Sequence, residues 1–444
     1  MLTGEWLRHS SDNRKKKTMI LSADQIAKQN LKHETLHQNN FGFLEEKLTG
    51  EGIHLSEIMA QLAAFQVAIP SWALGTGGTR FGRFSIGGEP INLMQKIEDI
   101  GVLHALTQNA GAVSLHIPWD KVDNYPELKE KASTLGIAFD AMNSNTFQDQ
   151  KEQPYSYKFG SLCNVDPAIR QQAVNHNLEV IEIGKKLGSK SLTVWLADGS
   201  NFPGQNNFQE VLKNTLDSLM HIYKALPEDW KLFIEYKPYE PNFYSMVIPD
   251  WGTSFMLANR LGPKAYTLVD LAHHLPNTNI EQIVATLMLQ GKLGGFHFND
   301  SKYGDDDLSV GSIKPYALFL IFNELVYGMQ ENKNNPYPAW MIDASHNTKD
   351  PLEDLLQSVE AILTAYAKAL LVDQKAVKKA QASHDVVLAQ ELLKKAYQTD
   401  VRPLLAEVRR LQKGALNPLA AYRQLNIRQQ LIDERGKDTV ASGL

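Results

Sequence analysis

The chain contains a single cysteine, Cys163, among its 444 residues. An internal disulfide is therefore impossible, which excludes a disulfide-stabilised scaffold and is compatible with a reducing compartment. Lone cysteines are more often small buried side chains than nucleophiles, so we do not expect a catalytic thiol. No stretch reaches the roughly 18 consecutive apolar residues that a membrane-spanning helix needs. The basic run at residues 14–17 is not followed by the apolar segment of a signal peptide, and we expect a cytoplasmic protein without a membrane partner.

The chain also lacks an excess of charge of either sign, since 45 basic residues stand against 50 acidic residues and the formal net charge is -5. Such a balance offers no general attraction to nucleic acid, so we expect no nucleic-acid partner. Low-complexity segments and repeats of fixed period are absent as well. What is present is an ordinary globular composition with 43% hydrophobic and 21% charged residues, which is enough to bury a sizeable core.

Eight short apolar runs, rich in β-branched and aromatic residues, alternate with amphipathic segments in the middle of the chain. Buried parallel strands read as such continuous runs, and their alternation with helices indicates a parallel sheet. The pattern predicts an α/β fold and, within that class, a (β/α)8 TIM barrel. The predicted strands lie in FQVAIP, AVSLHIPWD, GIAFDAMNSN, SLTVWLADGS, LFIEYKPYE, YTLVDLAHH, GGFHFND and AWMIDASHN.

The segments outside the barrel are predicted from composition and periodicity. We expect a disordered tail at residues 1–18, N-terminal helices at 19–64, the catalytic barrel at 65–350 and a helical extension at 351–444. The apolar stripes of the extension need a covering partner. Either a second subunit or the barrel wall of the same chain would supply it, so oligomerisation and simple packing both stay open.

Polar side chains stand at the ends of the predicted strands, where a barrel gathers its catalytic groups. Glu235, Asp270, His297 and Asp343 belong to the fifth to eighth predicted strands, which are neighbours in a barrel. Clustered carboxylates repel one another and raise each other's pKa unless a cation compensates them, so the cluster predicts a divalent metal ion. Carboxylate ligands with imidazole suit Mn²⁺, Co²⁺ or Zn²⁺ better than Ca²⁺.

Two further patterns are weaker by themselves. Asp270 and His273 are close enough in sequence to contribute to one site near a strand end. Asp305 and Asp307 flank Asp306, and in an extended backbone the outer two carboxylates would point the same way. A bare run of three aspartates is more often a solvated acidic turn.

Several longer blocks resemble the L-rhamnose isomerase family of broad aldose specificity, which belongs to the xylose-isomerase-like barrels. The resemblance extends over about residues 60–430 and rests on IPSWALGTGGTRFGRF, VSLHIPWD, FDAMNSNTF, LTVWLADGSNFPGQ, VDLAHHLPNTNIE and GKLGGFHFNDSKYGDDDL. It implies a homotetramer that interconverts L-rhamnose and L-rhamnulose and also acts on L-lyxose, L-mannose, D-allose and D-allulose. The partner would be a small-molecule monosaccharide, and the cofactors two divalent metal ions per subunit, Mn²⁺ before Co²⁺ or Zn²⁺.

Two sets of metal ligands follow from this resemblance. The first ion would be held by Glu235, Asp270, His297 and Asp343, and the second by Asp270, His273, Asp305 and Asp307. Asp270 would bridge the two ions. Tyr236 and Ala272 stand where the family has histidine and glycine, and neither departure changes a ligand.

The resemblance also implies catalytic and substrate-binding roles. Lys237 would direct its ammonium group at the O1 atom of the sugar, where it both binds and catalyses, and Asp343 would assist proton transfer. His116 would contact the far hydroxyls of the sugar or assist ring opening, although its apolar neighbours also fit a structural core histidine. The apolar walls of the site would be Trp72, Phe81 and Trp195.

Two other functions fit parts of the sequence. A metal-dependent phosphodiesterase can use the same kind of barrel, but it would need a basic groove to neutralise phosphates. The mildly acidic chain argues against such a groove. A non-catalytic sugar-binding protein could keep a metal for stability, but it would have no use for Lys237 and two ligand sets. We therefore expect an intramolecular oxidoreductase, an aldose–ketose isomerase.

Overall fold

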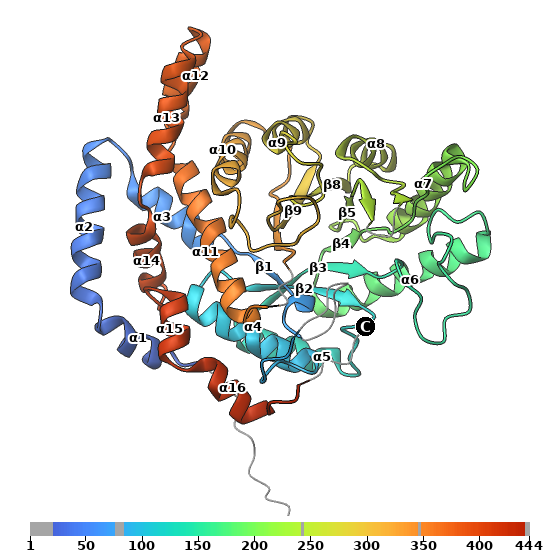
Figure 1. The fold of residues 1–444 in the computed structure, drawn as a ribbon, viewed down its shortest axis with the longest axis horizontal. Coiled ribbons are helices and arrows are strands. Elements are labelled where there is room, and N and C mark those ends of the chain that lie inside the picture. Colours follow the sequence, from blue (N-terminus) through green and yellow to red (C-terminus); the bar gives the residue numbers. More distant parts are fainter. Residues whose placement is uncertain (1–20, 76–83, 241–243, 345–347, 440–444) are drawn as a thin grey trace, which may run out of the picture.

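The computed structural model describes residues 21–75, 84–240, 244–344 and 348–439. A closed barrel of parallel strands, in the order β1-β10-β9-β8-β5-β4-β3-β2, lies at its centre (Figure 1). The strands are β1 (Ala68–Pro70), β2 (Ala112–Ile117), β3 (Ala138–Ser144), β4 (Ser191–Val194), β5 (Lys231–Glu235), β8 (Ala265–Asp270), β9 (Leu293–Phe298) and β10 (Ala339–Ile342). All eight predicted strands and the TIM barrel are confirmed. A hairpin of β6 (Tyr239–Glu240) and β7 (Tyr244–Ser245) was not predicted.

Helices follow the strands and cover the outside of the barrel. They are α4 (Leu93–Thr107), α5 (Tyr125–Thr134), α6 (Pro167–Leu187), α7 (Phe208–Ala225), α8 (Trp251–Leu261), α9 (Ile280–Leu289), α10 (Pro315–Glu331) and α11 (Pro351–Leu370), with one 3-10 turn, η1 (Ser71–Ala73), after β1. Seven of these α-helices begin at an Asn or Asp whose side chain accepts a backbone N–H of the first turn. Such caps fix the residue at which each loop ends and its helix begins.

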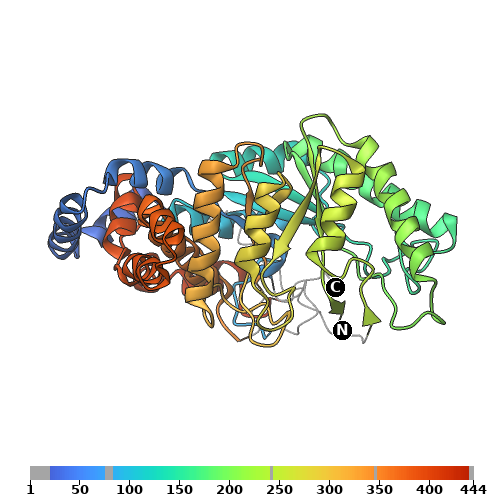
Figure 2. The ribbon, with the colours of Figure 1, turned by 90° about the horizontal axis from the view of Figure 1, so that it is seen from above.

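The two ends of the described chain pack together beside the barrel, as Figure 2 shows for the blue and red helices. The N-terminal helices are α1 (Ala23–Leu31), α2 (Glu34–Gly50) and α3 (Leu55–Ala64). The C-terminal ones are α12 (Gln374–Ala382), α13 (Val386–Gln398), α14 (Arg402–Leu411), α15 (Pro418–Gln424) and α16 (Ile427–Arg435). His37 of α2 lies 2.8 Å from the Glu407 carboxylate of α14, while α12 and α13 project from the body (Figure 1).

Within the described ranges, no single helix is long and apolar enough to cross a membrane. Only α11 and α12 taken together meet that requirement by length and composition, and the two are bent by 61° relative to each other.

The inside of the barrel carries an apolar layer below a polar one. The apolar layer is a small cluster formed by Ala68, Ala141, Phe233, Leu268 and Met341. Side chains alternate between the two faces of a strand, so residues two positions apart point to the same side. Glu235, Asp270 and Asp343 each follow a member of this cluster by two positions and therefore also point inward, at the C-terminal end of the barrel. The strand register places His297 directly beside Asp270.

Candidate active site and metal centre

Four side chains converge at the mouth of the barrel. Glu235 ends β5, Asp270 ends β8, His297 lies in β9 and Asp343 directly follows β10. Each offers one ligand atom, and these atoms all lie within 4.8 Å of one another. The first three side chains are buried, whereas the side chain of Asp343 is 21% exposed. Asp343 is therefore the member of this cluster that a molecule in the barrel mouth reaches most readily.

The electrostatics of the four residues fit a divalent cation. Burial and the carboxylates of Asp343 and Glu235 raise the pKa of Asp270 well above its usual value. Burial by itself lowers the pKa of His297, but the three carboxylates, Glu235 foremost, outweigh it and raise that pKa to about 10. His297 Nδ1 lies 3.0 Å from Glu235, 3.9 Å from Asp270 and 3.7 Å from Asp343. A cation among these atoms would relieve the crowding of negative charge.

The second predicted ligand set is less compact. His273 Nε2 lies 3.2 Å from Asp305 Oδ1 and 3.9 Å from Asp270 Oδ2. Asp307 is joined to Asp270 through Asn299, whose Nδ2 donates to Asp307 Oδ1 at 3.3 Å and to Asp270 Oδ1 at 3.0 Å. In the part of the chain that the structure describes, only the first set has all its ligand atoms close enough for one ion. The second ion stays a prediction.

The aspartate run after β9 forms a turn and not the extended backbone in which its outer carboxylates would point the same way. Asp305 and Asp307 adopt positive φ angles of 56° and 47°, in the left-handed region where Asp and Asn are the commonest residues after glycine. Both side chains are buried. The carboxylate of Asp306 instead turns back and accepts hydrogen bonds from the backbone amides of Lys302, Tyr303 and Gly304. The middle aspartate thus closes the turn that holds its two neighbours in place.

Lys237 lies two residues beyond Glu235, and its side chain is only 1% exposed. Its Nζ atom is 2.7 Å from Glu240 Oε2 and 2.5 Å from Asp305 Oδ2, and it lies 5.3 Å from the centre of a Trp195 ring. An ammonium group can be buried at acceptable cost only with such partners. Glu240 belongs to the short β6–β7 hairpin, which has no periodic signal in the sequence, so the sequence did not indicate this partner.

Trp72 and His116 stand beside the metal ligands. Trp72 Nε1 donates a hydrogen bond to Asp343 Oδ1 at 2.8 Å, and its ring meets the His116 ring edge-on at 5.5 Å. Burial lowers the pKa of His116 to about 3, so the imidazole is neutral at neutral pH. Its Nδ1 atom is buried and has no hydrogen-bond partner, which leaves it available to a bound molecule.

Further aromatic rings extend this wall around the barrel mouth. His116 packs against Trp119 and Phe147, and Phe147 lies 4.8 Å from Trp195 between ring centres. The structure therefore links His116 to Trp195 through Phe147 and adds two rings, Trp119 and Phe147, that the sequence did not single out. Both additional residues lie in loops just beyond a strand, and only that position could have indicated them. Phe81, the remaining predicted wall residue, lies outside the described residues.

Comparison with known proteins places the chain in a family. It is 53% identical over 418 residues to a probable sugar isomerase of Rhizobium meliloti (strain 1021), a match that covers 94% of this chain and 97% of the relative. The chain belongs to this sugar isomerase family. This sugar isomerase is also similar to a xylose isomerase of Thermus thermophilus, with 23% identity over 265 residues. That match covers 54% of this chain and 66% of the xylose isomerase. No protein-family model matches the chain.

Solved structures agree with the fold of this sugar isomerase. An L-ribulose 3-epimerase superposes with a TM-score of 0.52 at 12% identity, covering 70% of this chain and 99% of that one. The prediction of an isomerase built on a TIM barrel is confirmed, and neither a phosphodiesterase nor a non-catalytic binding protein is supported. The relatives are named as probable sugar isomerases, which is a broader description than the L-rhamnose isomerase family that the sequence resembles.

Proposed function

We propose that this sugar isomerase interconverts L-rhamnose and L-rhamnulose, and that it also accepts L-lyxose, L-mannose, D-allose and D-allulose. The observation that carries the proposal is the convergence of four metal-ligating side chains beside the buried ammonium group of Lys237. The sequence blocks that resemble L-rhamnose isomerases support this choice of sugar. The family supports isomerisation of a sugar as the reaction class.

The residues divide the work of the reaction as follows. A divalent metal ion, preferably Mn²⁺ and otherwise Co²⁺ or Zn²⁺, would polarise the sugar carbonyl and acidify the neighbouring hydroxyl. It would be held by Glu235, Asp270, His297 and Asp343. Lys237 places its positive charge where negative charge develops on O1 of the sugar. In the proton-transfer route, Asp343, the partly exposed carboxylate, would exchange the proton with the substrate, whereas a hydride shift needs no such group.

The aromatic wall keeps the rest of the sugar in place and away from water. Trp72, Phe147 and Trp195 offer apolar faces, which exclude water from the reacting carbons. The neutral imidazole of His116 uses its unpartnered Nδ1 for a hydroxyl at the far end of the sugar. Phe81, which the resemblance also places at the substrate, would complete this wall.

Metal-dependent turnover of free sugars tests the proposal. The protein is stripped with EDTA, Mn²⁺ is restored, and products from a panel of aldoses and ketoses are separated by chromatography. We expect L-rhamnulose from L-rhamnose only after metal is restored. In a Lys237→Met variant, metal content and circular dichroism should be unchanged, while kcat falls by about 10²–10³ or more because one charge-stabilising donor is lost. The absence of turnover for every sugar in the panel would contradict the proposal.

The fate of the transferred hydrogen separates two routes. With substrate deuterated at C2, a hydride shift retains deuterium at C1 of the product, whereas proton transfer through Asp343 exchanges it with water. Mass spectrometry of the product measures the retained fraction.

We also propose two metal ions per subunit, the second held by Asp270, His273, Asp305 and Asp307, and a homotetramer to which the helical extension contributes. Elemental analysis of the loaded protein counts the ions. Light scattering after size-exclusion chromatography gives the mass of the assembly in solution. A mass of one 49.8 kDa chain would contradict the tetramer.

A further inference from the structure

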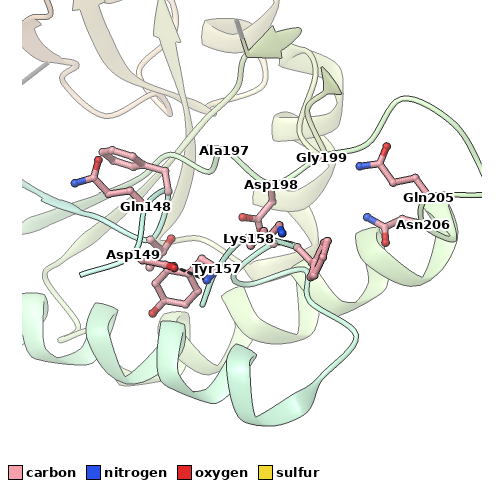
Figure 3. A pocket seen from close by; sticks show the side chains of 13 residues that line it. Gln148, Asp149, Tyr157, Lys158, Ala197, Asp198, Gly199, Gln205 and Asn206 are labelled. Carbon is pink, nitrogen blue, oxygen red and sulfur yellow. Dashed lines mark hydrogen bonds between the residues drawn. The ribbon is translucent and has the colours of Figure 1, made fainter. Parts of the chain in front are cut away.

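A cavity of about 540 Å³ opens beside the aromatic wall, between the loop that follows β3 and the loop that follows β4 (Figure 3). Its volume lies in the range of small-molecule sites. Gln148 and Asp149 approach it from one side, and Gln205 and Asn206 from the other (Figure 3). None of these four residues belongs to the metal site or to the wall described above.

One side chain belongs to both the cavity and the active site. Phe147 lines the cavity, and its ring lies 4.8 Å from the Trp195 ring and 5.5 Å from the His116 ring. Trp195 in turn lies 5.3 Å from Lys237 Nζ. Phe147 is therefore shared between the cavity and the aromatic wall that the proposed function places around the far end of the sugar. A ligand that extends past Phe147 would enter the cavity.

The loops around the cavity are fixed by buried hydrogen bonds. Asp198 accepts hydrogen bonds from the backbone amides of Ser161 at 2.8 Å and Cys163 at 3.0 Å, and from the Ser161 hydroxyl at 2.8 Å. These bonds tie the loop after β3 to the loop after β4. Gly199 lies so close to the β6–β7 hairpin that an added Cβ atom would meet Ser245 O at 1.9 Å. The cavity is thus preformed by packing rather than left between two independent loops.

The chemistry of the lining favours a neutral polyhydroxylated ligand. The side-chain amides of Gln148 and Asn206 make no hydrogen bond to any other residue that the structure describes, so each has both donors and an acceptor to offer. Phe147, Tyr157 and Phe159 add aromatic surface, on which the C–H face of a sugar can pack. Two acidic residues line the cavity against the single ammonium of Lys158, which disfavours a phosphate or carboxylate group.

We propose that this cavity is a second carbohydrate subsite, which takes a neutral sugar residue attached to the non-reacting end of the aldose. The natural substrate would then include short oligosaccharides whose reducing-end sugar reaches the metal centre. The inference rests on the proposed function, because it takes the aldose to lie with its far hydroxyls against His116 and Phe147.

Comparison of one mono- and one disaccharide tests the subsite. The probes are L-rhamnose and a (1→4)-linked rhamnosyl-rhamnose, each with the Mn²⁺-loaded enzyme. A Gln148→Leu/Asn206→Leu variant removes the two unpartnered amides from opposite sides of the cavity. We expect the ratio of kcat/KM for the disaccharide to kcat/KM for the monosaccharide to fall about tenfold. A Gln209→Leu variant makes the same change at an exposed position of α7 outside the cavity and should leave the ratio unchanged.

Saturation-transfer NMR with the same disaccharide reads binding without turnover. The subsite is supported if the non-reducing ring gives contacts that disappear in the double variant. This holds even if neither sugar is isomerised, and in that case only the proposed reaction is wrong. The subsite is refuted if the disaccharide is turned over with the same ratio by the double variant, or if the non-reducing ring receives no signal. Tighter, amide-dependent binding of a phosphorylated aldose would refute the neutral ligand class.

Discussion

Lys237 and Glu240 form an ion pair inside the barrel mouth, with Nζ 2.7 Å from Oε2 and side chains that are 1% and 9% exposed. The other close carboxylate partner of this ammonium, Asp305, is also a predicted metal ligand. If a second ion engages Asp305, Glu240 is the carboxylate that keeps Lys237 in place. The hairpin β6–β7 therefore has a direct link to the chemistry, although it provides no metal ligand.

A Glu240→Gln variant tests this positioning. The amide keeps the shape and one acceptor but loses the charge, so the ammonium group is held less firmly where O1 of the sugar is expected. We expect kcat to fall about tenfold with a smaller change in KM, and the free energy of unfolding to fall by about 2 kcal/mol because a buried charge-assisted hydrogen bond is weakened. Steady-state kinetics and urea unfolding measure the two effects.

The matched control is Glu228→Gln, which changes an exposed carboxylate 3.6 Å from Lys264. Exposed pairs contribute less than about 1 kcal/mol, so activity and stability should stay near those of the unchanged protein. Equal kinetics for the Glu240 and Glu228 variants would refute a positioning role for Glu240.

The barrel was predictable because its strands carry a strong local signal. A strand buried on both faces has to be apolar throughout, which makes each of the eight runs visible, from FQVAIP around Ile69 to AWMIDASHN around Met341. Polar residues at strand ends then indicate the active face, since Phe233 and Glu235, and likewise Leu268 and Asp270, point to the same side of their strand.

The rest of the site depends on contacts between distant loops, which no local pattern encodes. Glu240, Asn299 and Phe147 take part through hairpin and loop geometry, and apart from the position of Asn299 and Phe147 just beyond a strand, no local pattern indicates a role for them. The left-handed backbone of Asp305 could not be predicted from the sequence, because a tight turn with positive φ leaves no periodic trace. The bonds that Asp306 makes to three amides become visible only once that turn is folded.

Removal of the metal should reverse the effect of an Asp343→Asn variant on stability. Without metal, Glu235, Asp270 and Asp343 crowd one another, and the amide removes one charge while its oxygen still accepts the hydrogen bond from Trp72 Nε1. In EDTA we expect a Tm about 1–3 °C above that of the unchanged protein. With Mn²⁺ the order of the two Tm values should invert, because the weaker ligand set of the variant gains less stability from metal binding.

Differential scanning fluorimetry in EDTA and across a Mn²⁺ titration measures the Tm of the unchanged protein and of the Asp343→Asn variant under both conditions. Asp229→Asn, which alters an exposed carboxylate paired with Lys190, should behave like the unchanged protein at every metal concentration. The argument for a cation at the first ligand set is wrong if the Asp343 variant is less stable in EDTA and gains as much from Mn²⁺ as the unchanged protein does.

His116 should make stability depend on pH in a defined window. Its pKa is about 3 in the folded protein and 6.5 as a free side chain, so below pH 6.5 the unfolded chain binds a proton that the folded protein refuses. The contribution of neutral His116 to the free energy of unfolding is fully present above pH 6.5. It is lost as pH falls, by up to about 1.4 kcal/mol per pH unit. Between pH 6.5 and 5, most carboxylates remain ionised and interfere little.

Urea unfolding of the unchanged protein and a His116→Gln variant isolates this contribution, since every other histidine titrates in both. The free energy of unfolding of the unchanged protein, minus that of the variant, should shrink as pH falls from 7.5 to 5.5. A difference that stays constant over this range would mean that His116 takes up its proton in the folded state as it does in the unfolded one.

Variants at Asp306 and Asp307 should have different effects, the first on the stability of the turn and the second on catalysis. Asn tolerates the left-handed backbone at position 307 and can still accept the hydrogen bond from Asn299, so Asp307→Asn keeps this bond and removes the charge. We expect it to lower kcat at least 100-fold and to reduce the bound Mn²⁺ by one ion per chain. Asp306→Asn loses part of the bonding to three amides, which costs about 1–2 kcal/mol of stability but should lower kcat no more than tenfold. If both variants lose activity and metal equally, Asp307 acts through the turn rather than as a ligand.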